Sequence, residues 1–148
     1  MSNTRLAKRA PRAVLAAFLA LALPAAALAA ENFHARLSPV PIDATTAAAT
    51  KGTGTAAAEL DGTKLKLSGS FSGLRGAATV ARLHEGVATG VRGPAILEVA
   101  VPHEASGSFA VELTLTAAQA QGLRSGHVYL QIHSEAAPDG NLWGWLLQ

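Results

Sequence analysis

The chain has 148 residues, contains no cysteine, and carries 12 lysines and arginines against 10 aspartates and glutamates. Without cysteine there are no disulfides, so packing alone must hold the fold, and the chain is long enough for one domain to bury a core. Four of the basic residues lie within the first 12 positions, which leaves eight basic against ten acidic side chains, a net charge of −2. A basic surface for nucleic acid is therefore not expected.

The first 29 residues have the three parts of a secretory signal peptide. A basic start is followed by the 11-residue apolar run Ala13–Leu23, and Pro24 breaks this run before the small residues of Ala27-Leu28-Ala29. The run is shorter than a membrane-spanning helix needs, and no cysteine follows it to carry a lipid. We therefore expect a signal peptide at 1–29 and, at 30–148, an exported periplasmic or extracellular domain without a membrane anchor.

The rest of the chain has the patterns of short β-strands. Asp61-Gly62 between two alternating runs predicts a two-residue hairpin with a type I′ turn. In the run that follows, Leu65 and Leu67 alternate with lysine and serine, which gives one buried face and one wet face. The expected strands, in chain order, are Phe33–Leu37, Thr55–Leu60, Lys64–Ser70, Ala77–His84, Ala95–Val101, Ser108–Leu115, Val128–His133 and Leu142–Leu147.

Two segments between the strands have other patterns. Thr116 is suited to cap a short helical turn over Ala117–Gln121, and Gly122 is suited to end it. Ala44–Thr50 is apolar only through its alanines, so both a loop and a ragged edge strand are open for it. Short strands separated by glycine, proline, aspartate and serine predict an all-β sandwich.

Four pieces of the sequence occur in the order and spacing of one known family. They are Phe71–Leu74; Ala81–Gly86 with Gly93-Pro94; Leu113–Thr116 leading to Leu123–Gly126; and Tyr129–Ser134 followed by Pro138–Gly144. Together they resemble the CHRD domain over essentially all of residues 33–147. The resemblance implies an immunoglobulin-like, antiparallel Greek-key β-sandwich of about eight strands, distantly similar to copper/zinc superoxide dismutases. The family's acidic-Val-Pro-Pro element is replaced by Ser38–Pro41, and an arginine near the C-terminus is replaced by Trp143.

His84 and His133 are the candidate ligand-binding residues. Each lies near the end of an expected strand that runs into a loop rich in turn residues, where rigid scaffolds present functional groups. Alternation along the later strand places His127, Tyr129 and His133 on one face. Neutral imidazoles from neighbouring strands suit copper or zinc. The competing interpretation is structural: each ring donates an N–H to a loop carbonyl, and His84 pins the loop Gly86–Gly93.

The comparison with superoxide dismutases argues against dismutase activity. Those enzymes have a His-x-His pair where this chain has Arg82 and His84, and a further histidine where it has His133. A metal centre usually needs three or four protein ligands, so two imidazoles are too few, and the Arg82 cation would repel a metal ion. We therefore expect a non-catalytic binding or structural module rather than an enzyme. Copper or zinc binding by His84 and His133 is the alternative function.

Trp143 and Trp145 are the candidate residues for contact with a partner. Because they lie two apart on an expected strand, they share a face, while Leu142 and Leu146 share the other. If the leucines point inward, both indoles point outward and suit a carbohydrate or protein partner. The alternative is that the strand is covered on both sides, or that the tryptophans close one end of the barrel.

Overall fold

The computed structural model describes residues 29–40, 43–44 and 46–148, so the expected signal peptide at 1–29 lies outside the described residues except for its last position. The described chain is all-β apart from one short helix, which confirms the predicted fold class, and all eight expected strands are present. The strands are β1 Glu31–Pro39, β2 Thr53–Asp61, β3 Lys64–Ser72, β4 Ala78–Glu85, β5 Ala95–Val99, β6 Gly107–Thr114, β7 Val128–Ser134 and β8 Ala137–Trp145, and the helix α1 is Ala117–Arg124.

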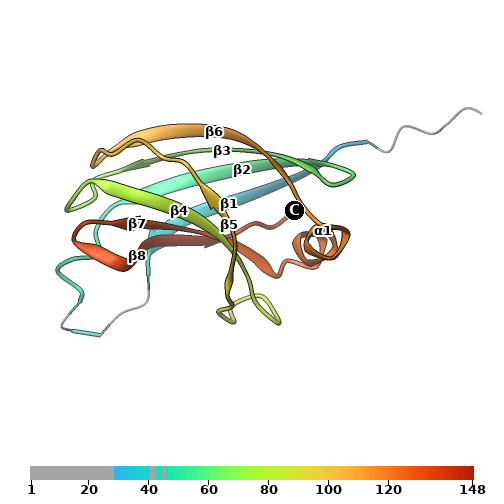
Figure 1. Ribbon diagram of the computed structural model, residues 1–148. Helices are drawn as coiled ribbons and strands as arrows, with labels where there is room; N and C mark the ends of the chain where they lie inside the picture. Colours follow the sequence, from blue (N-terminus) through green and yellow to red (C-terminus); the bar gives the residue numbers. More distant parts are fainter. Residues whose placement is uncertain (1–28, 41–42, 45) are drawn as a thin grey trace, which may run out of the picture.

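The strands form two facing layers that are joined along one side (Figure 1). One layer has the order β1-β2-β3-β6 and the other has the order β5-β4-β7-β8, with antiparallel pairing throughout. The layers are continuous because the end of β1 pairs with β8, through Ser38 opposite Trp143 and Pro39 opposite Leu142. β3 and β6 are neighbours although β4 and β5 lie between them in the chain, as a Greek-key connection requires.

Alternation along the strands fills the space between the layers. In β1 and β3 every second side chain is buried, as in Phe33, Leu37, Leu65 and Leu67, while the lysines of β3 face water. Strand β7 is buried on both faces, since all seven of its residues are buried. Its inner face supplies core residues such as Leu130. Its outer face holds polar side chains in a dry environment, where each needs a partner.

The β2–β3 hairpin differs from the prediction by one residue. Asp61 pairs with Lys64, so the two-residue loop is Gly62-Thr63 rather than Asp61-Gly62. Gly62 has a φ of 61°, and no non-glycine residue in the described chain has a positive φ. A type I′ turn needs positive φ at both central residues, so that prediction is wrong. A glycine at the first central position fits a type II′ turn.

Helix α1 begins where predicted and ends later. The Thr116 hydroxyl accepts from the Gln119 N–H at 3.2 Å, and the Gln119 side chain accepts from the Thr116 N–H at 2.9 Å, so the two residues form a capping box. Gly122 does not end the helix but is buried within it. The helix ends at Arg124, shortly before Gly126, whose φ of 71° is a conformation that glycine adopts at low cost. In the described part of the chain, no helix is both long and apolar enough to cross a membrane.

Strand β8 begins earlier than the prediction at 142–147. The stretch Pro138-Asp139-Gly140 has turn-forming residue types but continues the strand, with Gly140 at a φ of 133°. A Cβ at Gly140 would overlap the side-chain amide of Gln131, so the backbone approaches β7 closely there. Residues 44 and 46–49 form turns and no described residue of the segment 44–50 is in a strand, which decides that open alternative in favour of a loop.

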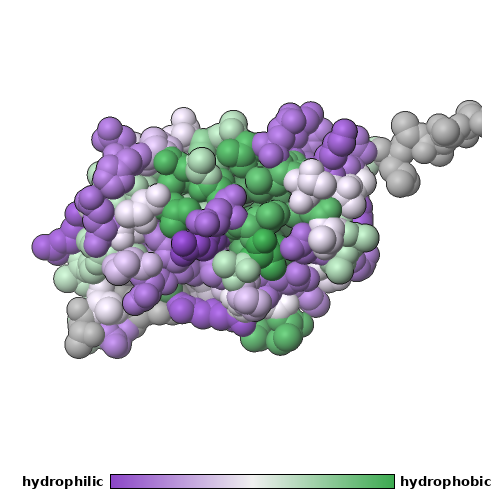
Figure 2. Space-filling model, in the orientation of Figure 1, coloured by the Kyte–Doolittle hydropathy of each residue, from purple (hydrophilic) through white to green (hydrophobic). Residues whose placement is uncertain are grey.

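The two layers part on the side opposite their junction. β5 and β6 are the outer strands of the sheet order and do not pair with each other. Hydrophobic residues gather on the face of the molecule around this opening, between β6 at the top and β5 in front (Figure 2). The side chains that close this side of the core are only partly buried: Ile96, Leu97, Val101, Val111 and Leu113.

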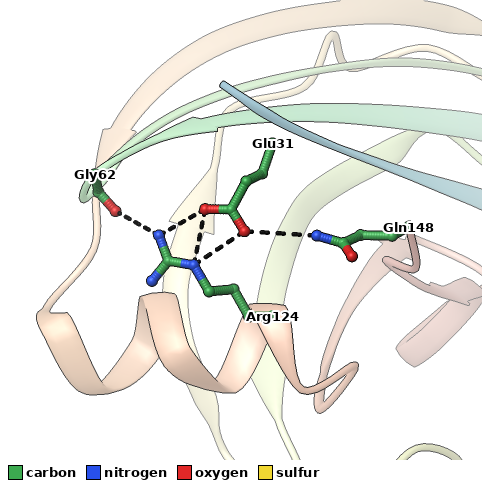
Figure 3. Close-up of polar contacts among 4 residues, drawn as sticks. All are labelled: Glu31, Gly62, Arg124 and Gln148. Atoms are coloured by element: carbon green, nitrogen blue, oxygen red, sulfur yellow. Dashed lines mark hydrogen bonds and ion pairs between the residues drawn. The ribbon is translucent and has the colours of Figure 1, made fainter. Parts of the chain in front are cut away.

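An ion pair ties the start of β1 to the end of α1 (Figure 3). Nε of Arg124 donates to the two Glu31 carboxylate oxygens at 2.8 and 3.0 Å, and its Nη2 lies 2.7 Å from Glu31 Oε1. The same Nη2 donates to the Gly62 carbonyl at 3.4 Å, and the Gln148 amide donates to Glu31 at 3.5 Å. The hydrogen bond from Arg124 holds the pKa of the Glu31 carboxyl below its usual 4.5.

We expect Glu31→Gln to be less stable than the wild type at neutral pH, by a margin that disappears on acidification. Because the pKa of Glu31 is lower in the folded protein, its contribution is present above pH 4.5 and is lost as the pH falls through the folded-state pKa. Urea unfolding of both proteins between neutral pH and well below pH 4.5 measures this margin. Glu59→Gln, which removes a 3.8 Å pair with Lys66, is the exposed control. A margin that stays constant with pH would contradict the assignment.

Candidate functional site

Three neighbouring strands of the second layer place histidine and aromatic side chains on one surface. In one row across β4, β7 and β8, His84 lies opposite Tyr129, and Tyr129 lies opposite Trp145. His133 and Trp143 lie on the same face of β7 and β8, because alternate residues of a strand point the same way. These five residues are called the histidine–aromatic face below. The alternating residues Leu83, Leu130, Ile132 and Leu142 point into the core.

The ring of His84 holds the loop between β4 and β5. Its Nδ1 lies 3.0 Å from the carbonyl oxygen of Gly93, and the Tyr129 hydroxyl donates to the same oxygen at 3.2 Å. A carbonyl can only accept, so Nδ1 of His84 carries the proton. Gly93 is packed so closely that a Cβ there would overlap the carbonyl of Glu85. The expected contact between His84 and the loop 86–93 is therefore present.

The ring of His133 makes the equivalent contact with the start of β8. Its Nδ1 lies 2.8 Å from the carbonyl oxygen of Pro138, and the neighbouring Gln131 amide donates to the Asp139 carbonyl at 2.8 Å. The register of the β7–β8 pair shifts beside His133, which frees the Pro138 carbonyl from the strand ladder. The proton of His133 is again on Nδ1, for the same reason as in His84.

The second ring nitrogen of each histidine has no hydrogen-bond partner among the described residues. Nε2 of His84 and Nε2 of His133 are both buried atoms. Since each Nδ1 carries the proton, each neutral ring has an unprotonated, buried lone pair on Nε2. A buried acceptor without a partner costs about 1–3 kcal/mol. Two such atoms lie on one face, and no contact within the described residues satisfies either of them.

The two imidazoles are near neighbours. Their ring centres lie 6.4 Å apart, and their planes differ by 28°. The Tyr129 ring stacks on His84, with centres 4.9 Å apart and planes that differ by 15°. His84 on β4 pairs with Tyr129 on β7, and His133 lies four residues further along β7. The two imidazole rings are nevertheless neighbours. The stacking by Tyr129 and the two carbonyl contacts fix the orientation of the rings.

His133 is held in its neutral form. Burial lowers its pKa below the usual 6.5, and the nearby positive charge of Arg82 lowers it further, while the Pro138 carbonyl acts in the opposite direction. The ring is therefore unprotonated at Nε2 at and above pH 6.5. The unfolded chain binds this proton more readily, so acidification below pH 6.5 favours unfolding.

Arg82, which was expected to repel a cation, has its own counter-ion. Its Nη2 lies 3.4 Å from Oε2 of Glu98 on the outer strand β5. Both side chains are open to solvent, with 36% and 69% exposure. The charge of Arg82 is therefore partly compensated and screened, although it still influences His133.

His127 lies apart from His84 and His133. It precedes β7, in the connection from α1; its N–H donates to the Gly122 carbonyl and its carbonyl accepts from the Gly86 N–H, both at 2.9 Å. Across the described ranges, no group of three or more His, Cys, Asp or Glu side chains is arranged to hold a metal ion. His127 is therefore not brought to His84 and His133 as a third ligand.

Trp143 and Trp145 are on the outer side of β8, as the alternation predicts, and the leucines that flank them are fully buried. Both indoles are half-buried. They pack on the Tyr129 ring at 5.6 and 4.6 Å between centres, and the Arg92 guanidinium lies 5.1 Å over Trp143. The tryptophans thus form a wall of the histidine–aromatic face, and their contact with a partner stays a prediction.

Fold and site together define an all-β sandwich domain with paired histidines on the outer face of one sheet. The family model of the CHRD domain matches residues 33–146. The chain belongs to the CHRD domain family, which confirms the resemblance noted in the sequence. No curated protein and no solved structure matches the chain.

Sequence reasoning found the two histidines and expected loop carbonyls to hold them, but it named neither carbonyl and did not foresee the stacking of Tyr129 on His84. The carbonyls of Gly93 and Pro138 come from backbone segments whose approach depends on tertiary packing, and the stacking of Tyr129 on His84 depends on strand register. One signal was available: glycine at 93 is the residue type that a close backbone approach needs.

Proposed function

We propose that this protein is an exported, non-catalytic binding module of the CHRD type, and that it binds a copper or zinc ion through His84 and His133. One observation carries the proposal: both rings donate Nδ1–H to a backbone carbonyl and keep a buried, unpartnered Nε2. A ligating histidine almost always donates its other N–H to a carbonyl, carboxylate or water, which fixes the tautomer. Neutral imidazole nitrogen is a preferred ligand of both metals.

The small number of donors supports binding rather than turnover. Within the described residues, no third acidic or histidine side chain joins the pair. A catalytic metal usually has three protein ligands and an open position for substrate. Neither His84 nor His133 is hydrogen-bonded to a serine, threonine or acidic side chain that it would activate or be oriented by. The site is therefore suited to hold an ion and not to transform a substrate.

The competing role for the same residues is purely structural. The Nδ1 contacts with Gly93 and Pro138 fasten two loops to the sheet, and this fastening needs no ligand on Nε2. Asparagine separates the two roles, because its side-chain amide can donate near the position of Nδ1 but has no atom at the position of Nε2.

We expect His84→Asn and His133→Asn each to abolish stoichiometric copper or zinc binding while the fold is retained, because each removes one of only two donors. Metal analysis and calorimetric titration of the purified protein give stoichiometry and affinity, and thermal unfolding without metal reports the fold. The matched control is His34→Ala, an exposed histidine of β1. One ion per chain in the wild type and in the control supports the proposal. If the wild-type protein binds no ion, or if the variants still bind the ion and lose only thermal stability, the two histidines have only the structural role of fastening the loops.

A further inference from the structure

The donor set of the His84–His133 pair limits which ion it can hold. The pair offers two nitrogen donors, and the described chain brings no third His, Cys, Asp or Glu side chain to them. Zn²⁺ is almost always bound in tetrahedral sites, with three or four protein ligands. A closed-shell monovalent ion of the copper group is satisfied by two donors on opposite sides. Two imidazoles alone therefore suit Cu(I) better than Zn²⁺.

The surroundings of the pair favour a low ionic charge. Both Nε2 atoms are buried, and the aromatic ring of Tyr129 lies against His84. The cost of moving an ion out of water rises steeply with its charge, and within the described residues no acidic side chain joins the two histidines as a third ligand. Arg82 adds a positive charge close enough to act on His133, and the negative charge of Asp139 acts on the same ring in the opposite direction. A monovalent ion therefore meets a smaller desolvation penalty at this pair than a divalent ion does.

The spacing of the rings agrees with one ion between them. With metal–nitrogen bonds of about 2.0–2.1 Å, two imidazoles that bind one ion from opposite sides have ring centres about 6–6.5 Å apart. The ring centres of His84 and His133 are 6.4 Å apart. The carbonyls of Gly93 and Pro138 hold both rings by Nδ1, so the spacing is set before an ion arrives.

We infer that His84 and His133 form a two-coordinate site that selects Cu(I) over Cu(II) and Zn(II). This inference rests on the proposed function, because it assumes that the pair is a metal site. The protein then handles reduced copper, and it needs no redox step of its own. Ag(I), which has the same charge and the same preference for two donors, is a redox-stable probe of the site.

The test is an anaerobic competition titration of the full protein with Cu(I) against a chromophoric Cu(I) chelator, with parallel titrations of Ag(I), Cu(II) and Zn(II). We expect one Cu(I) or Ag(I) per chain and Zn(II) binding weaker by about 100-fold or more. His84→Asn and His133→Asn should both abolish the stoichiometric Cu(I) binding, and His34→Ala should not. X-ray absorption of the Cu(I) form should report two nitrogen donors.

The outcomes separate the inference from the proposed function. Zn(II) or Cu(II) binding that equals or exceeds Cu(I) binding, and that is lost in both asparagine variants, would overturn the Cu(I) selectivity and leave the metal site. Cu(I) bound with three or more protein donors would overturn the two-coordinate site. No stoichiometric binding of any of the four ions, or binding that persists in both variants, would overturn the inference and the proposed function together.

Discussion

Leu130→Ala is expected to lower the free energy of unfolding by about 2–5 kcal/mol. Leu130 has 0% exposure and lies on β7, between β4 and β8 and beneath the histidine–aromatic face. Strands on both sides are hydrogen-bonded to β7, so they cannot move inward to fill the cavity that the substitution leaves. The loss is large compared with the total stability of a domain of this size.

Urea unfolding, followed by tryptophan fluorescence, measures this loss directly, since Trp143 and Trp145 lie on the strand next to β7. Val87→Ala is the matched control: Val87 is 82% exposed in the loop after β4. Removing an exposed aliphatic group there should change stability by less than about 0.5 kcal/mol. Equal effects of the two substitutions would show that Leu130 does not lie in a closely packed core.

Gly93→Ala is expected to disturb the candidate site without removing any of its side chains. A Cβ at position 93 would overlap the backbone carbonyl of Glu85, and backbone on both sides cannot give way as a flexible side chain does. The loop must then move, and the carbonyl that orients His84 and Tyr129 moves with it. Such forced overpacking costs about 1–3 kcal/mol, and loss of an outer contact to a ligating histidine weakens metal binding by about 10–100-fold.

Two measurements on Gly93→Ala distinguish a local from a global effect. Thermal unfolding without metal reports the stability loss, and the Cu(I) titration reports the affinity. Val87→Ala, in the same loop, should leave both unchanged, because its side chain is largely in solvent. If Gly93→Ala bound copper as tightly as the wild type, the loop carbonyl would not be what orients His84.

Much of the fold could be predicted from local patterns, because the layers need alternation and the loops need turn residues. All eight strands and the Thr116 cap were identified in this way. The errors fall where tertiary contacts override local preference. Pro138-Asp139-Gly140 favours a turn by residue type, yet it continues β8 because it packs against Gln131 and His133. Gly122 resembles a helix end, but it lies buried inside α1, where the Glu85 side chain packs against it.

The candidate site was only half predictable for a related reason. Strand alternation indicates which face His84 and His133 occupy, and this was enough to nominate them. Their ring spacing depends on the register between β4 and β7 and on the irregularities in that register, which no local pattern contains. The position of His127 could not be predicted for the same reason. It fits the sequence alternation with Tyr129 and His133, but it lies before β7 begins.

The junction between the layers has a consequence for how the chain acquires its structure. β1 and β8 meet through two residue pairs whose partners are more than 100 positions apart in the sequence. β1 therefore cannot complete its pairing until β8 is available. Pairings over such separations close slowly, because the intervening chain has to lose its freedom first. A polypeptide that emerges with its N-terminus first can form the β1–β2–β3 meander early. The two layers can join only when the final strand has emerged, so the histidine–aromatic face is among the last parts of the domain to form.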